Sequence, residues 1–198
     1  MPDLEPDQNT PAETSDTAPV ERRNPALIAT AVALPVALVI GIIAAAVIAG
    51  RSPALQPVAL GPVPAPSSRS AECDALMAAL PDKLGDYTRA ELVEPAPEAA
   101  AAWQPAEGEP LVLRCGLDRP AEFDQASALQ VINGVQWFEI PGESAGIDAS
   151  SWFAVDRGVY VALTVPNGVG PTPLQDISDV VAETLPEQPL DPAPVVIP

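Results

Sequence analysis

The stretch that decides the fold is residues 128–140, "ALQVINGVQWFEI". Asn133-Gly134 stands between two apolar runs, and this dipeptide favours the tight turn of a β-hairpin because both positions tolerate positive φ. A second stretch, "SWFAVDRGVYVALTV" at 151–165, repeats the pattern around Arg157-Gly158. Two hairpins predict an antiparallel sheet.

Other segments extend this sheet and flank it. Residues 110–116 ("PLVLRCG") carry a strand pattern, and 86–93 ("DYTRAELV") carry a weaker one, which gives five or six strands. A helix is predicted after Ser70 as N-cap, and another from Thr172 as N-cap, with Gln175 completing a capping box. The expected fold class is α+β, a small antiparallel sheet flanked by an N-terminal and a C-terminal helix.

The helical predictions rest on apolar stripes at spacings of three and four residues. These stripes consist of Cys73, Leu76, Met77 and Leu80 in the first helix and of Leu174, Ile177, Val181 and Leu185 in the second. Pro81 and Pro186 follow them and end the helices, since proline disfavours helical backbone in the residue before it.

The chain outside residues 70–185 divides into four further zones. Residues 1–24 are acidic and predict a disordered cytoplasmic tail, residues 51–69 a Pro-rich linker, and residues 186–198 a Pro-rich tail. Residues 25–50 carry no charge and are long enough for a single transmembrane helix. The apolar run is too long, and its leader too acidic, for a cleaved signal peptide.

Charges beside the apolar segment predict its orientation. Two arginines, Arg22 and Arg23, precede it, and only Arg51 follows closely. Positive charge favours the cytoplasmic side, so the N-terminus is expected in the cytoplasm and residues 70–185 outside it. The expected location is the cell membrane, with the protein as an integral, single-pass component.

Composition excludes several classes of function. A net charge of −18 argues against a nucleic-acid partner, which needs clustered Lys and Arg. There is no histidine and a single lysine, Lys83, so histidine-based catalysis and most zinc sites are excluded. No metal, cofactor or catalytic residue is predicted. An enzyme that uses near pairs of carboxylates, such as Asp82 with Asp86, is the least favoured alternative.

The chain has only two cysteines, Cys73 and Cys115. A reactive thiol, a metal site and a cross-link are the alternatives, but no CxxC motif or histidine supports the first two. In a domain outside the cytoplasm, an even pair most simply forms a disulfide. A disulfide between these cysteines closes the chain from Cys73 to Cys115 into a loop. On the chain-entropy estimate this adds at most about 4 kcal/mol to the free energy of unfolding.

Three residues are candidates for contact with a ligand or partner. Trp103 offers a flat apolar face, with core packing as the alternative. Arg114 and Arg119 in "LRCGLDRP" are two of the few cations and could bind a carboxylate or phosphate, although an ion pair with a local acid is favoured. Trp137 and Trp152 lie in strand-like runs and are expected in the core.

Five motifs together resemble the actinobacterial domain-of-unknown-function 3515 family. They are "CDALMAALPDKLG", "AAAAWQP", "PLVLRCGLDRP", "VINGVQWF" and a closing helix, over roughly residues 70–185. The resemblance implies a membrane-anchored or exported envelope protein and carries over no catalytic residue.

Two functions therefore compete. The first is a single-pass cell-envelope protein whose disulfide-stapled outer domain is a non-enzymatic protein-interaction module with an envelope protein as partner. The alternative is a ligand-binding module for a cell-wall glycopeptide or lipid. An apolar groove would favour the alternative, and a flat exposed patch would favour the first.

Overall fold

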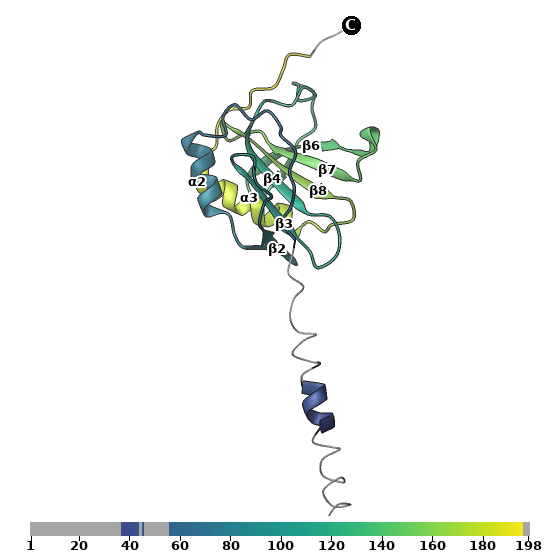
Figure 1. Cartoon of the computed structure of the whole chain (residues 1–198). Helices are drawn as coiled ribbons and strands as arrows, with labels where there is room; N and C mark the ends of the chain where they lie inside the picture. The colour runs from purple at the N-terminus through teal and green to yellow at the C-terminus, as the bar shows by residue number, and fades with distance from the viewer. Residues whose placement is uncertain (1–36, 44, 46–55, 196–198) are drawn as a thin grey trace, which may run out of the picture. The chain divides into compact units, whose positions relative to one another are not determined.

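The computed structural model describes residues 37–43, 45 and 56–195. The chain divides into two units, residues 1–51 and residues 52–198. The second unit holds all the named helices and strands (Figure 1).

The second unit is built on one eight-stranded sheet in the order β1-β2-β3-β4-β8-β7-β6-β5. The strands are β1 (Lys83–Leu84), β2 (Tyr87–Ala90), β3 (Ala100–Gln104), β4 (Leu111–Leu117), β5 (Gln130–Ile132), β6 (Val135–Pro141), β7 (Ala149–Ala154) and β8 (Tyr160–Pro166). Every neighbouring pair is antiparallel. The antiparallel sheet was expected, but the prediction of five or six strands is wrong.

The two strands that the sequence did not predict are β1 and β3. Strand β1 has only two residues, too few for a periodic pattern. Strand β3 is an alanine run, and alanine is depleted in strands. Its first four residues are nevertheless all buried, because β3 lies between β2 and β4 with material packed on both faces.

The first hairpin has the predicted turn. Asn133 and Gly134 have φ values of 47° and 79°, and Ile132 pairs with Val135 across the turn. The Asn133 side-chain amide donates a 2.8 Å hydrogen bond to the Asp179 carboxylate on helix α3 (Thr172–Thr184). The turn therefore fixes both the strand register and the position of the helix.

Helices α2 (Ala71–Ala79) and α3 lie on one face of the sheet, and a short 3₁₀ turn, η1 (Glu143–Ala145), follows β6 (Figure 1). Ser70 is the N-cap of α2 as predicted, and its hydroxyl accepts a hydrogen bond from the Cys73 amide. The predicted cap of α3 is wrong by one residue. Pro171 occupies that position, and no side chain caps the helix.

The main core lies between the sheet and the two helices. Inward residues of β3, β4, β6 and β8 alternate with outward ones and meet the apolar faces of α2 and α3. The Cys73–Cys115 disulfide crosses this core and joins α2 to β4, and both of its residues are fully buried. The expected pairing is present.

A smaller cluster covers part of the opposite face. Phe123, Phe138 and Val155 are its buried members, and the Phe123 and Phe138 rings lie 5.5 Å apart between centroids. Leu190, from the segment predicted as a Pro-rich tail, packs against them. The Ala193 amide also donates to the Phe123 carbonyl oxygen, so this part of the tail lies on the domain.

No helix in the described part of the chain has the length and hydropathy to cross a membrane. This finding contradicts the transmembrane helix expected at 25–50 and the single-pass membrane location built on it. Residues 37–43 and 45 are the part of this segment that the structure describes, and they are helical. The rest of 25–50, together with the predicted tail 1–24, lies outside the described residues.

The disulfide gives the first testable prediction. The double variant Cys73→Ala/Cys115→Ala should lose up to about 4 kcal/mol of unfolding free energy, because the unfolded chain regains the entropy of the open loop. Urea unfolding of the oxidised protein and the variant measures this difference. Equal midpoints with equal slopes would contradict it.

Candidate functional site

The segment that precedes α2 lies against the domain. We call residues 56–69 the strap, and they include most of the segment predicted as a Pro-rich linker. Val58 is 7% exposed; its amide donates to the Glu91 carbonyl oxygen at 2.8 Å, and its carbonyl oxygen accepts from the Val93 amide at 2.9 Å. Further along, the Ser67 amide donates to the Gly116 carbonyl oxygen at 3.0 Å. Backbone hydrogen bonds thus hold the strap near both of its ends.

Gly116 makes the close approach of the strap possible. It sits at a register shift in the pairing of β4 with β8, with φ of 80°. A Cβ at this position would lie 2.3 Å from backbone atoms of Ser67 and Ser68. Any side chain there would both strain the backbone and push the strap away.

A pocket of about 420 Å³ lies between the strap and the domain. The strap supplies one wall, the segment 95–98 another, and β4 the third. The lining residues are Leu60, Pro62, Val63, Ala65, Ser68, Pro95, Ala96, Pro97, Glu98, Arg114 and Leu117. Most are aliphatic or proline and none is aromatic. The volume falls in the range of small-molecule sites, about 300–1,000 Å³.

Arg114 is the one cation in the lining of this pocket. Successive strand residues point to opposite faces, so Cys115 points into the core and Arg114 to the strap side. The Arg114 Nη2 atom donates a 2.9 Å hydrogen bond to the Gly61 carbonyl oxygen of the strap. Among the described residues, Arg114 forms no ion pair with an acidic side chain.

The electrostatics of Arg114 follow from its partial burial. Burial lowers its pKa, and no neighbouring carboxylate raises it. Arginine nevertheless stays protonated in proteins, so the pocket contains a partly desolvated positive charge.

The acid in the pocket lining, Glu98, already has a partner. Its carboxylate forms a bidentate ion pair with Arg69 of the strap, and the hydrogen bond from Arg69 is the largest cause of its lowered pKa. Both side chains are exposed, so the pair contributes little to stability. It does neutralise Glu98, which leaves Arg114 as the uncompensated charge.

The other two candidate residues lie elsewhere. Trp103 is fully buried in the main core, where its indole N–H donates to the Pro81 carbonyl oxygen at 2.9 Å, so it offers no surface to a ligand. Arg119 donates to the Asp191 carbonyl oxygen at 3.2 Å and lies 3.6 Å from its carboxylate. The structure therefore brings only Arg114 of the three to a pocket.

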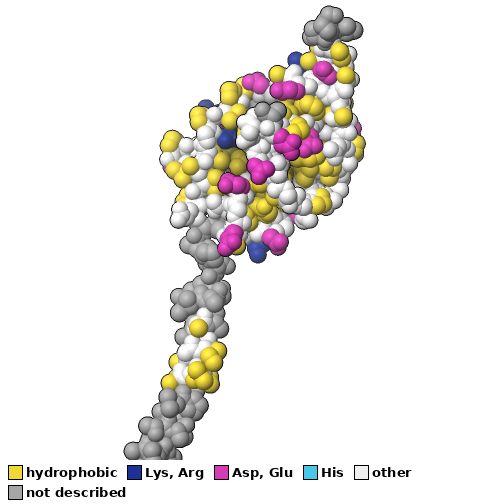
Figure 2. Space-filling view, turned by 90° about the vertical axis from the view of Figure 1, so that its right-hand side faces the viewer, with side chains coloured by type: hydrophobic (Ala, Val, Ile, Leu, Met, Phe, Trp, Pro, Cys, Tyr) yellow, Lys and Arg dark blue, Asp and Glu magenta, His cyan; other side chains and the backbone are white. Residues whose placement is uncertain are grey.

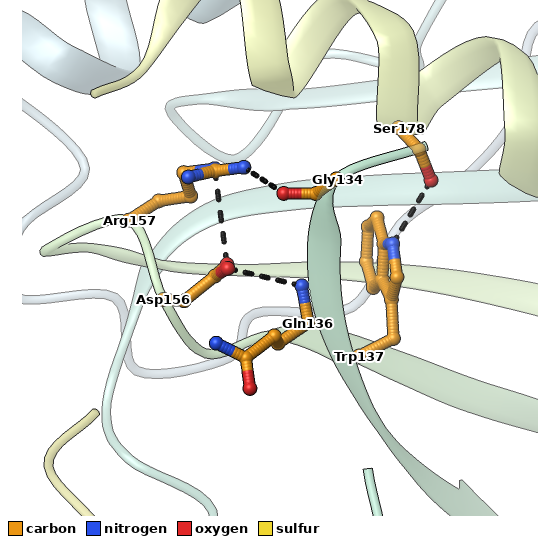
Figure 3. Close-up of polar contacts among 6 residues, drawn as sticks. All are labelled: Gly134, Gln136, Trp137, Asp156, Arg157 and Ser178. Carbon is orange, nitrogen blue, oxygen red and sulfur yellow. Dashed lines mark hydrogen bonds and ion pairs between the residues drawn. The ribbon is translucent and has the colours of Figure 1, made fainter. Parts of the chain in front are cut away.

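A second polar group lies inside the domain, at the β7–β8 turn (Figure 3). The Asp156 carboxylate accepts from the Gln136 amide at 3.1 Å, and the Arg157 guanidinium donates to the Gly134 carbonyl oxygen. Both side chains are almost fully buried, and their charged groups are 3.7 Å apart. These contacts tie the two hairpins together, which is a structural role.

The tryptophans expected in the core are packed there. Trp137 is fully buried and donates to the Ser178 hydroxyl on α3 at 2.9 Å (Figure 3). Ser178 in turn donates to the Leu174 carbonyl oxygen, so its hydroxyl has both a donor and an acceptor role satisfied. Trp152 is partly buried against the same core.

Acidic side chains outnumber basic ones on the face of the second unit that Figure 2 shows. Figure 2 shows Asp and Glu spread over the face in view, with few Lys or Arg. Within the described ranges, no three Asp, Glu or Cys side chains lie close enough together to hold a metal ion.

Comparison with known proteins identifies the family. A family model described as "Protein of unknown function (DUF3515)" matches residues 32–190, and the chain belongs to this family. No curated protein and no solved structure matches the chain.

The strap contact at Gly116 is testable with a matched pair of variants. Gly116→Ala should speed amide hydrogen exchange at Ser67 and Val58, because the new Cβ displaces the strap. Gly134→Ala imposes a similar backbone strain at φ of 79° but meets no atom within 4 Å, so strap exchange should stay as in the wild type. Equal exchange at Ser67 in both variants would show that Gly116 does not hold the strap.

The buried Asp156 predicts a pH dependence of stability. Burial raises its pKa in the folded protein above the value of about 3.9 expected in the unfolded chain. The contribution of Asp156 to the free energy of unfolding is thus fully present below its pKa in the unfolded chain. It is lost as pH rises through its pKa in the folded protein. As pH rises from about 4 through the raised pKa of Asp156, wild-type stability should therefore fall relative to Asp156→Asn.

Urea unfolding at several pH values measures this difference. The same substitution at the exposed Asp118 controls for the loss of one negative charge. If the curves for the wild type and Asp156→Asn run parallel across the pH range, the buried carboxylate is not responsible for any pH dependence.

Proposed function

We propose that the second unit is a non-enzymatic ligand-binding module and that its site is the pocket between the strap and β4. The observation that carries the proposal is the pocket itself. It has the volume of a small-molecule site, mostly aliphatic walls and few polar groups, and a pocket with these features is a typical ligand site. Of its two charged side chains, Glu98 is paired with Arg69, and Arg114 has no ion-pair partner among the described residues.

The lining favours one kind of ligand within the range considered from sequence. Sugars and aromatic groups are commonly held against aromatic faces, and the pocket has none. Aliphatic walls suit a ligand with a flexible hydrocarbon part, and burying such a part contributes about 0.8 kcal/mol per CH₂ group. A lipid-like molecule therefore fits better than a glycopeptide.

A protein-interaction module, the first expectation from sequence, stays a prediction. The large apolar side chains that are exposed in the second unit belong to separate segments, namely Val63, Val93, Val131, Ile147 and Val195. Among the described residues, no single segment of the second unit therefore carries two of these side chains, and no partner surface is identified.

Nuclear magnetic resonance tests the proposed function without knowledge of the natural ligand. Octanoate and octanol, added below the concentrations at which they aggregate, should shift the backbone amides of the non-proline residues at the pocket, which are Leu60, Gly61, Val63, Ala65, Ala96 and Glu98. For ligands of this size we expect dissociation constants in roughly the millimolar to micromolar range.

A pocket-filling variant locates the site. Val63→Trp should weaken binding of both probes about tenfold or more, because the indole occupies volume in the pocket. Val131→Trp is the matched control, since Val131 is also exposed but lies on β5, away from the pocket lining. If neither probe shifts the lining residues, or both variants bind alike, the proposed function is wrong.

A further inference from the structure

We infer that the ligand of this pocket is an aliphatic anion, whose acidic head group binds the guanidinium of Arg114 while its hydrocarbon part lies between the strap and the segment 95–98. This inference rests on the proposed function and names its ligand class. A fatty-acid carboxylate and a lipid phosphate share the chemistry.

The first argument is the incomplete pairing of Arg114. A guanidinium has five N–H donors, and within the described part of the chain Arg114 makes one hydrogen bond, from Nη2 to the strap. No Arg114 nitrogen is among the described buried polar atoms that lack a hydrogen-bond partner, so its remaining donors are accessible to an anion that enters the pocket. A carboxylate or phosphate satisfies two donors at once in the bidentate geometry that arginine favours.

The second argument is charge complementarity within the site. The charged side chains of the strap and the lining are Arg69, Glu98 and Arg114, and the first two neutralise each other. The local balance is positive although the chain is strongly acidic. Repulsion from distant surface carboxylates is screened beyond about 8 Å at physiological ionic strength, whereas a direct contact with Arg114 is not.

The third argument is the position of the charge relative to the apolar walls. Arg114 binds the strap at Gly61, between the lining residues Leu60 and Pro62, so its guanidinium lies beside the aliphatic wall. A molecule with an anionic head and a hydrocarbon tail can therefore contact both features. A neutral alcohol can contact only the aliphatic walls, and a small inorganic anion can bind only the Arg114 guanidinium.

The test compares head groups on one hydrocarbon chain. Octanoate, octyl phosphate, octanol and octylamine are titrated against the full chain, with the shifts of the lining amides as readout. We expect at least one of the two anions to bind about tenfold or more tightly than octanol, the gain typical of a charged hydrogen bond. Octylamine should bind no better than octanol.

Variants test whether Arg114 causes the preference for anions over octanol. Arg114→Gln should weaken the preferred anion about tenfold to a hundredfold and leave octanol unchanged, whereas Arg114→Lys should retain part of the preference. Arg119→Gln removes one positive charge outside the pocket, so it should change the binding of neither the preferred anion nor octanol. Octanol also controls for a structural effect, because a loosened strap would weaken all the probes alike.

The outcomes separate the two proposals. Equal binding of anions and octanol at the lining residues, or equal losses for both in Arg114→Gln, overturns the anionic class and leaves the pocket as a binding site. No shift of the lining residues with any probe overturns both. Tighter binding of octanoate than of octyl phosphate indicates that the ligand is a fatty-acid carboxylate. The reverse order indicates a lipid phosphate.

Discussion

The strand β4 is the constraint on which the rest of the domain depends. Its Cys115 is bonded to Cys73 on α2, which fixes the strand against the helices and sets which of its residues point inward. The alternation of the strand then directs the neighbouring Arg114 to the opposite face. Gly116, one residue further, leaves room for the strap. Three consecutive residues of β4 therefore have three roles. Arg114 supplies the positive charge of the pocket, Cys115 joins the strand to the core, and Gly116 allows the close approach of the strap that forms one wall.

The strap shows how a proline-rich segment can be part of a folded unit. Proline cannot donate a backbone hydrogen bond, so residues 56–69 cannot form a regular hydrogen-bonded strand. They pair instead at isolated points, through Val58 and Ser67. Strap residues between these two points line the pocket together with Arg114 and Leu117 of β4.

The sequence predicted those parts of the fold that local patterns encode. The Asn133-Gly134 turn and the Ser70 cap depend on neighbouring residues, and both were predicted correctly. The alanine strand β3 was missed because its burial comes from neighbours distant in sequence. Arg114 could be named as a candidate, but its aliphatic surroundings come from the strap and the segment 95–98, and no pattern in β4 signals them.

The most direct test of the account is a measurement of nuclear Overhauser contacts between bound octanoate and the methyl groups of the protein. The account predicts contacts from the octanoate methylene protons to Leu60, Val63 and Leu117, with the carboxylate end nearest Arg114. Contacts to the second apolar cluster, at Val155 and Leu190, would place the ligand elsewhere and contradict the account.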